Sequence, residues 1–265
     1  MTASVSMRKK PVPLLLTIIT TLALLASPSG CIETQTGPQV TRQEIKHEIK
    51  RIEVKRRTYT KQGRLHPYAG YSQARHLDIV NGVGNRLLGE SGINMDVVFT
   101  VDESEDVNAA ASPGKIFVTT GMMRFVRSED ELAAVVGHEI AHLTNDHVRK
   151  SMTTNLPVII GSVIADALSP GSGKVVQMGG GIFTQKFSRD MEREADYYGI
   201  IYAHNAGYDG RVGADVWERF ALELPQSQQE NIFASHPTST ERIIRVRKIA
   251  DGLQGRGKVT PPPPK

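Results

Sequence analysis

SEDELAAVVGHEIAHL, residues 128–143, carries the strongest helix signal of this chain. It opens with a capping box, Ser128 followed three residues later by Glu131, which is a helix-start signal. Apolar residues then recur at helical spacing, namely Leu132, Val135, Val136, Ile140 and Leu143. The stretch therefore predicts an amphipathic helix with one apolar side facing a core.

The same helix carries the pattern H-E-x-x-H. His138 and His142 are four residues apart, so both imidazoles lie on one helix face and can reach a single zinc ion. Glu139 leans to the side of such a site, where it can accept a proton from a water molecule activated by the metal. The pattern therefore indicates metal-assisted hydrolysis.

A second segment, SRDMEREAD at residues 188–196, supplies candidates for the third ligand that a catalytic zinc needs. Glu192 and Asp196 are four apart, which suits one carboxylate on the metal and one holding a ligand histidine by its other ring nitrogen. Glu194 competes with Glu192, but it lies about 200° around the helix, so both cannot face one ion. The alternative for the pair is a solvated acidic face paired with neighbouring arginines.

Composition narrows the classes of site and partner. Cys31 is the only cysteine among 265 residues, so any metal must be bound by His, Asp or Glu, and no disulfide forms within the chain. The formal net charge is +4, but Arg8, Lys9 and Lys10 supply three of these charges, so nucleic acid is not a predicted partner. The basic stretch 42–61 is either a solvated face or a surface for anionic lipid headgroups.

Residues 1–30 read as a lipoprotein signal peptide. Basic residues precede an apolar run at 11–26 that is short for a stable membrane span. The run leads into Pro28-Ser29-Gly30-Cys31, which resembles the bacterial lipoprotein box, with proline where leucine is usual. We expect acylation of Cys31 and, because Ile32 follows it, a periplasm-facing lipoprotein of the outer membrane. An ordinary cleaved signal and an uncleaved anchor are the alternatives.

The rest of the chain predicts one α+β domain, mainly helical with a small sheet. We expect a charged tether over 31–62, partly helical through Gln43–Arg57, the domain over 63–255 and a disordered proline-rich tail over 256–265. Within the domain, helices are expected at 74–88, 128–143, 157–168, 191–203, 211–224 and 240–253, and strands at 96–101 and 115–120.

Three ordered motifs carry a family resemblance: the H-E-x-x-H helix, the S-R-x-x-E-x-x-A-D segment, and His236-Pro237 with Arg242. Together they resemble the HtpX-like and CAAX-prenyl-protease family of zinc metalloendopeptidases, and within it the periplasmic BepA/LoiP type. The resemblance implies a gluzincin-like zincin domain with one Zn²⁺ per chain. It makes His138, His142 and Glu192 the metal ligands and Asp196 a supporting residue. It also implies that residues 108–111 and 116–121 form the edge beside the cleft, where a substrate strand can pair.

Three further residues, His236, Arg242 and His147, each have two possible roles. In related proteases a histidine after the metal site either stabilises the oxyanion or reaches the metal and keeps the enzyme inactive, and the resemblance gives His236 these roles. Spacing alone makes it a loop histidine. Arg242 pairs either with the developing oxyanion or with Asp196. His147 is near His142, but at five residues it is rotated off the helix face, so we interpret it as structural.

The expected function is a zinc metalloendopeptidase that hydrolyses peptide bonds of misfolded or unassembled cell-envelope proteins, with Glu139 as general base. Expected partners are protein or peptide substrates, the membrane through lipidated Cys31, and, as a candidate, the outer-membrane assembly machinery. The rival hypothesis is an envelope chaperone or assembly factor whose protease site is silent. Glu139 argues against a purely structural metal, because such a site needs no base.

Overall fold

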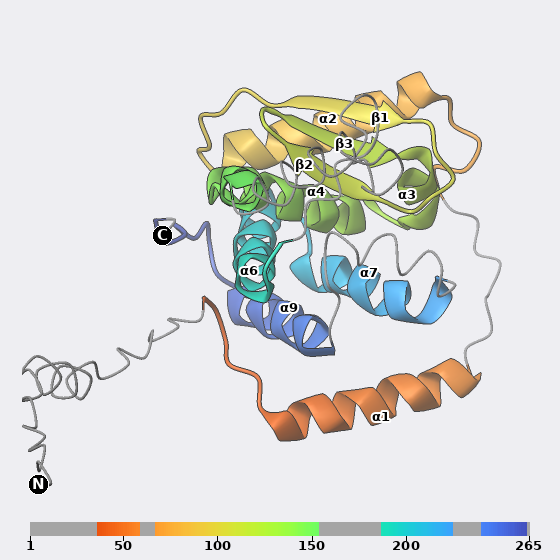
Figure 1. The fold of residues 1–265 in the computed structure, drawn as a ribbon, viewed down its shortest axis with the longest axis vertical. Coiled ribbons are helices and arrows are strands. Elements are labelled where there is room, and N and C mark those ends of the chain that lie inside the picture. Colours follow the sequence, from red (N-terminus) through yellow and green to blue (C-terminus); the bar gives the residue numbers. More distant parts are fainter. Residues whose placement is uncertain (1–35, 59–66, 154–186, 225–239, 264–265) are drawn as a thin grey trace, which may run out of the picture. The chain divides into compact units, whose positions relative to one another are not determined.

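The computed structural model describes residues 36–58, 67–153, 187–224 and 240–263 (Figure 1). All of them belong to one compact unit, Gln35–Lys265, which is separate from Met1–Thr34. The predicted signal peptide, Cys31, the apolar segment 157–168 and His236 lie outside the described residues.

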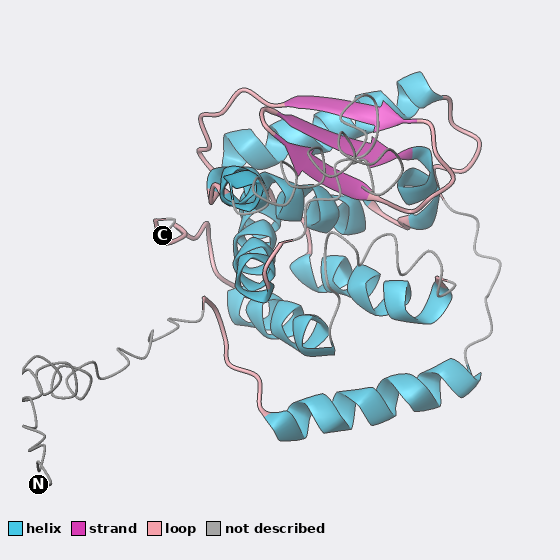
Figure 2. Cartoon of the chain, in the orientation of Figure 1, coloured by secondary structure: helices cyan, strands magenta, loops and turns pink. Residues whose placement is uncertain are grey.

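The described part of the chain is mainly helical with one small sheet, so the predicted fold class is confirmed (Figure 2). Its helices are α1 (Arg42–Thr58), α2 (Gln73–Glu90), α3 (Thr120–Phe125), α4 (Glu129–Thr144), α6 (Arg189–Asn205), α7 (Gly210–Glu223) and α9 (Thr240–Leu253). Its strands are β1 (Val98–Asp102), β2 (Ala109–Ser112) and β3 (Lys115–Thr119). Within these described ranges, no helix is both long enough and apolar enough to cross a bilayer.

The three strands form one sheet in the order β1-β3-β2. β1 runs parallel to β3, with Val98 opposite Lys115, and β2 runs antiparallel to β3, with Ala109 opposite Val118. The sequence predicted β1 and β3 but missed β2, because a run of alanine and serine has little strand propensity. A tight turn, in which Gly114 has a φ of 70°, folds the chain back so that β2 pairs with β3. It therefore forms the edge of the sheet next to α4, with which it is in contact.

Helix α4 lies at the centre of the unit and contacts α2, α6, α7 and β2. Ser128 caps it as predicted, since its hydroxyl accepts the Glu131 backbone N–H at 3.2 Å. The Glu131 carboxylate, however, accepts from the backbone of Arg127 at 2.7 Å and from Arg219 at 2.5 Å. The expectation of one apolar side is too narrow, because every residue from Glu131 to His142 is buried. The polar residues of α4 are therefore enclosed with its apolar ones.

Two glycines set how closely α4 meets α6. A Cβ atom on Gly199 would lie 2.7 Å from the backbone nitrogen of His138, and one on Gly137 would lie 2.8 Å from the carbonyl oxygen of Gly199. Real Cβ atoms do not approach backbone atoms this closely, so the two helices touch backbone to backbone at this crossing. The contact brings the histidine face of α4 against the acidic face of α6.

The segment expected to be a tether contains α1, which packs against α9. Glu48 and Ile52 are buried, and Arg51 and Lys55 pair with Glu218 of α7 at 2.9 and 2.7 Å. The predicted helicity of this segment is present, but an unattached linker would not bury these residues. Acidic residues of α1 hold the helix against α9, because they pair with basic side chains of α9 such as Arg247.

The C-terminal residues 256–263 also differ from the expected disordered tail. They form neither helix nor strand, as their prolines predict, but they are held against α6. The Tyr198 hydroxyl donates to the carbonyl oxygen of Pro262 at 2.8 Å, and the Val259 backbone N–H donates to Asn205 at 2.8 Å. Proline lacks a donor but keeps its carbonyl acceptor, so a proline-rich segment can still be fixed by side chains.

Candidate metal centre

His138 and His142 of α4 and Glu192 of α6 converge on one point. Their candidate ligand atoms all lie within 4.8 Å of one another. The Nε2 atoms of the two histidines are 3.0 Å apart, and the Glu192 carboxylate oxygens lie 3.5 Å from Nε2 of His138 and 3.4 Å from Nε2 of His142. The structure thus brings together the three residues that the sequence proposed as ligands.

These separations fit a tetrahedral zinc ion. Zinc binds imidazole nitrogen and carboxylate oxygen at about 2.0–2.2 Å, so two ligand atoms at the tetrahedral angle lie roughly 3.3 Å apart. The two Nε2 atoms are 3.0 Å apart, and each lies near that distance from one oxygen of Glu192, at 3.5 Å from Oε2 for His138 and 3.4 Å from Oε1 for His142. Two imidazoles and one carboxylate are also the donor set of catalytic zinc sites that keep a fourth position open.

Asp196 and Arg242 surround the candidate ligands. Asp196 lies 3.1 Å from Nδ1 of His138, on the side of the ring opposite Nε2. Arg242 of α9 donates to both carboxylate oxygens of Asp196 at 2.7 and 2.8 Å, and its Nη1 lies 2.5 Å from Glu192. One guanidinium therefore fixes both carboxylates that face His138, which ties α9 to α6 at the site.

These contacts perturb the titration of the buried groups. Burial by itself would lower the pKa of His138, but hydrogen bonds with Asp196 and Glu192 outweigh it and raise the pKa to about 9. Burial would raise the pKa of Asp196, but Arg242 and His138 hold that pKa below its usual value. Burial opposes the charge of Arg242, yet Asp196 and Glu192 raise its pKa. Arg242 and Asp196 thus form a buried ion pair.

Aromatic rings pack around the histidines. Phe187 stacks on His142 with 3.8 Å between ring centroids, and Trp217 of α7 meets the His138 ring edge-on at 5.4 Å. The Arg242 guanidinium lies 4.8 Å above the Trp217 ring. Sequence reasoning missed Phe187 and Trp217, because no spacing links either of them to the H-E-x-x-H helix. Their packing restricts the rotation of both imidazoles.

His147 lies next to a candidate ligand, although helical spacing had placed it off the face. Its Nδ1 is 3.1 Å from Nδ1 of His142, and its Nε2 is 3.1 Å from the Glu194 carboxylate. The spacing rule does not apply, because α4 ends at Thr144 and Asp146 has a left-handed φ of 61° before the chain becomes helical again. This turn brings His147 back beside His142. Glu194, the competing ligand candidate, faces His147.

Glu139 is buried beside His138, with 2% of its surface exposed. It lies near enough to Arg242 for the negative charge of Glu139 to favour the protonated guanidinium. The structure therefore collects six of the seven predicted site residues in one buried cluster. His236, the seventh, lies outside the described residues.

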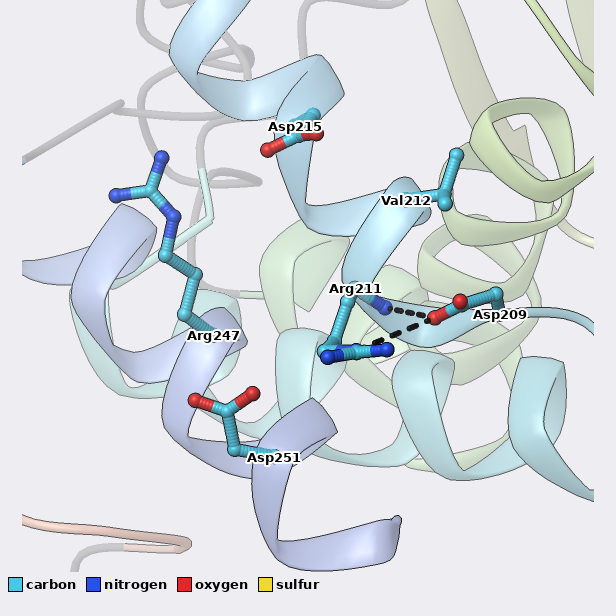
Figure 3. Close-up of a pocket in the computed structure, with 6 residues that line it drawn as sticks. All are labelled: Asp209, Arg211, Val212, Asp215, Arg247 and Asp251. Carbon is cyan, nitrogen blue, oxygen red and sulfur yellow. Dashed lines mark hydrogen bonds and ion pairs between the residues drawn. The ribbon is translucent and has the colours of Figure 1, made fainter.

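A separate surface hollow of about 290 Å³ lies between α7 and α9 (Figure 3). Its lining residues are Asp209, Arg211, Val212, Asp215, Arg247 and Asp251. None belongs to the metal cluster, and its two arginines already have acidic neighbours, Arg211 at 3.8 Å from Asp209 and Arg247 at 2.7 Å from Glu48. The candidate chemistry is therefore assigned to the cluster around His138.

Comparisons with known proteins give a consistent family. The model of Peptidase family M48 matches residues 78–250. The mitochondrial metalloendopeptidase OMA1 of Arabidopsis thaliana is 35% identical over 57% of this chain, and metalloprotease LoiP of Escherichia coli K12 is 32% identical over 66% of it. A putative beta-barrel assembly-enhancing protease of Vibrio cholerae is 28% identical over 65% of it. The matches span 30%, 70% and 39% of these three proteins, respectively.

The family match covers the chain from α2 to the last turns of α9. It includes all six described residues of the cluster. The resemblance drawn from the three sequence motifs is therefore confirmed, and the chain belongs to peptidase family M48.

Proposed function

We propose that this chain is a zinc metalloendopeptidase in which His138, His142 and Glu192 hold the ion. One observation carries the proposal: two imidazoles and one carboxylate, all buried and from two helices, converge so closely that their candidate ligand atoms lie within 4.8 Å of one another. When bound, zinc supplies a Lewis acid that polarises a carbonyl group and acidifies a water molecule.

The residues around the ion have separate roles in this proposal. Glu139 accepts a proton from the attacking water and returns it to the nitrogen of the leaving amine. Asp196 accepts a hydrogen bond from Nδ1 of His138, which directs Nε2 of that ring to the metal. The contacts of Arg242 with Asp196 and Glu192 favour a role in holding these carboxylates over direct contact with substrate. For His236, the family resemblance predicts one of two roles: it either stabilises the oxyanion or keeps the enzyme inactive. Both roles stay predictions.

The proposed substrates are extended segments of misfolded or unassembled envelope proteins. β2 lies at the edge of the sheet and contacts α4, the helix that carries the candidate ligands. An extended peptide can add to a sheet edge through backbone hydrogen bonds, which do not depend on its sequence. A folded substrate would have to unfold locally to offer such a strand.

The proposed location is the bacterial envelope, with acylated Cys31 anchoring the chain in the outer membrane on the periplasmic side. The motif at residues 28–31 supports the anchor. Relatives named as beta-barrel assembly-enhancing proteases support a link to the outer-membrane assembly machinery.

The deciding experiment measures cleavage of unfolded casein by the zinc-loaded chain beginning at Gln35 and by its Glu139→Gln variant. The variant should keep its zinc and lose at least about 100-fold in turnover, because the proton acceptor is gone while the ligands remain. Turnover within a few-fold of the parent would refute Glu139 as the base. Zinc binding without cleavage by either protein would support the rival chaperone or assembly factor.

A further inference from the structure

Helix α1 pairs its acidic residues with the rest of the unit. Glu44 lies 2.6 Å from Lys248 and Glu48 lies 2.7 Å from Arg247, both on α9. On the same side, Arg51 and Lys55 both pair with Glu218 of α7. Two of the three acidic residues of α1 therefore lie on the side of the helix that faces α9, and not on the opposite side.

That opposite side carries a basic stripe, made up of Arg42, Lys46, Lys50 and Arg57. At 100° per residue these four positions fall within an arc of about 80°. All four are exposed. Glu53 is the one acid within the same arc, so the stripe has a formal charge of +3 when that residue is counted. In Figure 1, α1 lies at the bottom of the view, with α9 and α7 on one side of it only.

Two large apolar side chains border the basic stripe. Ile49 has 43% of its surface exposed and projects just before Arg42 around the helix, and Val54 has 54% exposed and projects just beyond Lys50. Cations flanked by apolar groups suit the boundary between lipid headgroups and acyl chains. The apolar content is low, which favours a helix lying on the headgroups over one inserted among the acyl chains.

The chain before α1 is held close to the unit. Arg245 of α9 donates to the carbonyl oxygens of Thr36 and of Pro38, the latter at 2.7 Å. Cys31 precedes Thr36 by five residues, which span at most about 18 Å when fully extended. An acyl anchor on Cys31, as proposed above, would therefore hold a bilayer near the start of α1. The positive charge of the stripe is present with or without that anchor.

We propose that the basic stripe of α1 binds the anionic headgroups of a lipid bilayer. The helix would then lie along the membrane surface, with its acidic side turned to α9. The interaction is electrostatic, so it weakens as ionic strength rises and the Debye length shortens.

The test is co-sedimentation of the chain beginning at Gln35, which lacks Cys31, with vesicles of phosphatidylglycerol and phosphatidylcholine. Pure phosphatidylcholine vesicles are the neutral reference. The Lys46→Glu/Lys50→Glu variant should bind the anionic vesicles at least about 25-fold more weakly, since each basic residue near an anionic surface contributes on the order of fivefold. Arg75→Glu/Arg256→Glu makes the same change in net charge at two exposed sites outside α1 and should bind within about threefold of the parent.

Unchanged zinc binding by both variants shows that they are folded, and cleavage of casein is not needed for the result. The proposal is overturned if the parent ignores anionic vesicles. It is also overturned if the α1 variant binds as the parent does, or if the control variant loses as much binding as the α1 variant. If the parent does not bind vesicles and only the α1 variant changes its oligomeric state, the basic stripe would instead be a contact with a second copy of the chain.

Discussion

Replacing His147 with phenylalanine should weaken zinc binding, although His147 is not proposed to touch the metal. To bind zinc through Nε2, His142 must carry its proton on Nδ1, and that proton is donated to Nδ1 of His147 at 3.1 Å. His147 then carries its own proton on Nε2 and donates it to Glu194 at 3.1 Å. Burial lowers the pKa of His147 despite the opposing effect of Glu194, which favours the neutral ring that this chain of hydrogen bonds requires.

The expected loss is about 10–100-fold in zinc affinity. Without its acceptor, the Nδ1–H group of His142 is buried without a hydrogen-bond partner. The tautomer that binds zinc through Nε2 is therefore disfavoured. A buried hydrogen bond of this kind is worth about 1–3 kcal/mol, and each 1.4 kcal/mol is tenfold in affinity. Removing the hydrogen-bond partner of a ligating histidine usually lowers metal affinity by a similar factor.

Zinc affinity is measured by competition with a chromogenic chelator, and the cobalt(II) absorption spectrum reports the ligand geometry. Glu194→Gln should lose only a few-fold, since the amide oxygen still accepts from His147. His76→Phe is the matched control, because His76 is also a buried histidine but bonds the Tyr68 carbonyl at 2.9 Å, outside the metal cluster. It should lose stability and keep its zinc affinity. A His147→Phe variant that binds zinc within twofold of the parent, with an unchanged cobalt spectrum, would contradict this role of His147.

Three further outcomes are expected. Arg242→Met leaves its two carboxylate partners buried without a counter-charge, so the free energy of unfolding in urea should fall by about 3–5 kcal/mol; a loss below 1 kcal/mol would contradict this. Gly199→Ala places a Cβ atom against the α4 backbone and should cost about 1–3 kcal/mol, whereas Gly82→Ala, which has open space around it, should cost nothing in the same denaturation assay. Burial would raise the pKa of Glu48 and of Glu218, but their basic partners hold both pKa values below 4.5. The ion pairs of these two residues therefore stabilise the docked α1 above pH 4.5, and this stabilisation is lost as the pH falls through the lowered pKa values. Hydrogen exchange in α1 should be constant from pH 5 to 7, after correction for the intrinsic rate, and speed up in acid; protection that persists at pH 2 would contradict it.

Local patterns predicted most of the helices, because their signals lie within the helices themselves. Ser188 caps α6 by accepting the Met191 backbone N–H at 3.2 Å, and Gly207, with a φ of 80°, follows its last turn. α9 begins at Thr240 and ends at Leu253, as the apolar spacing indicated. β2 and the docked position of α1 have no such local signal, since each depends on a partner far away in the chain.

For the site, helical spacing alone predicts which residues share a helix face: His138 with His142, and Glu192 with Asp196. A helix turn fixes that relation before any packing occurs. The packing of the helices brings these two faces together, through the close crossing at Gly199, and places Arg242 against both carboxylates. Contacts between separate helices depend on how their backbones pack, and a periodic pattern carries no information about that partner.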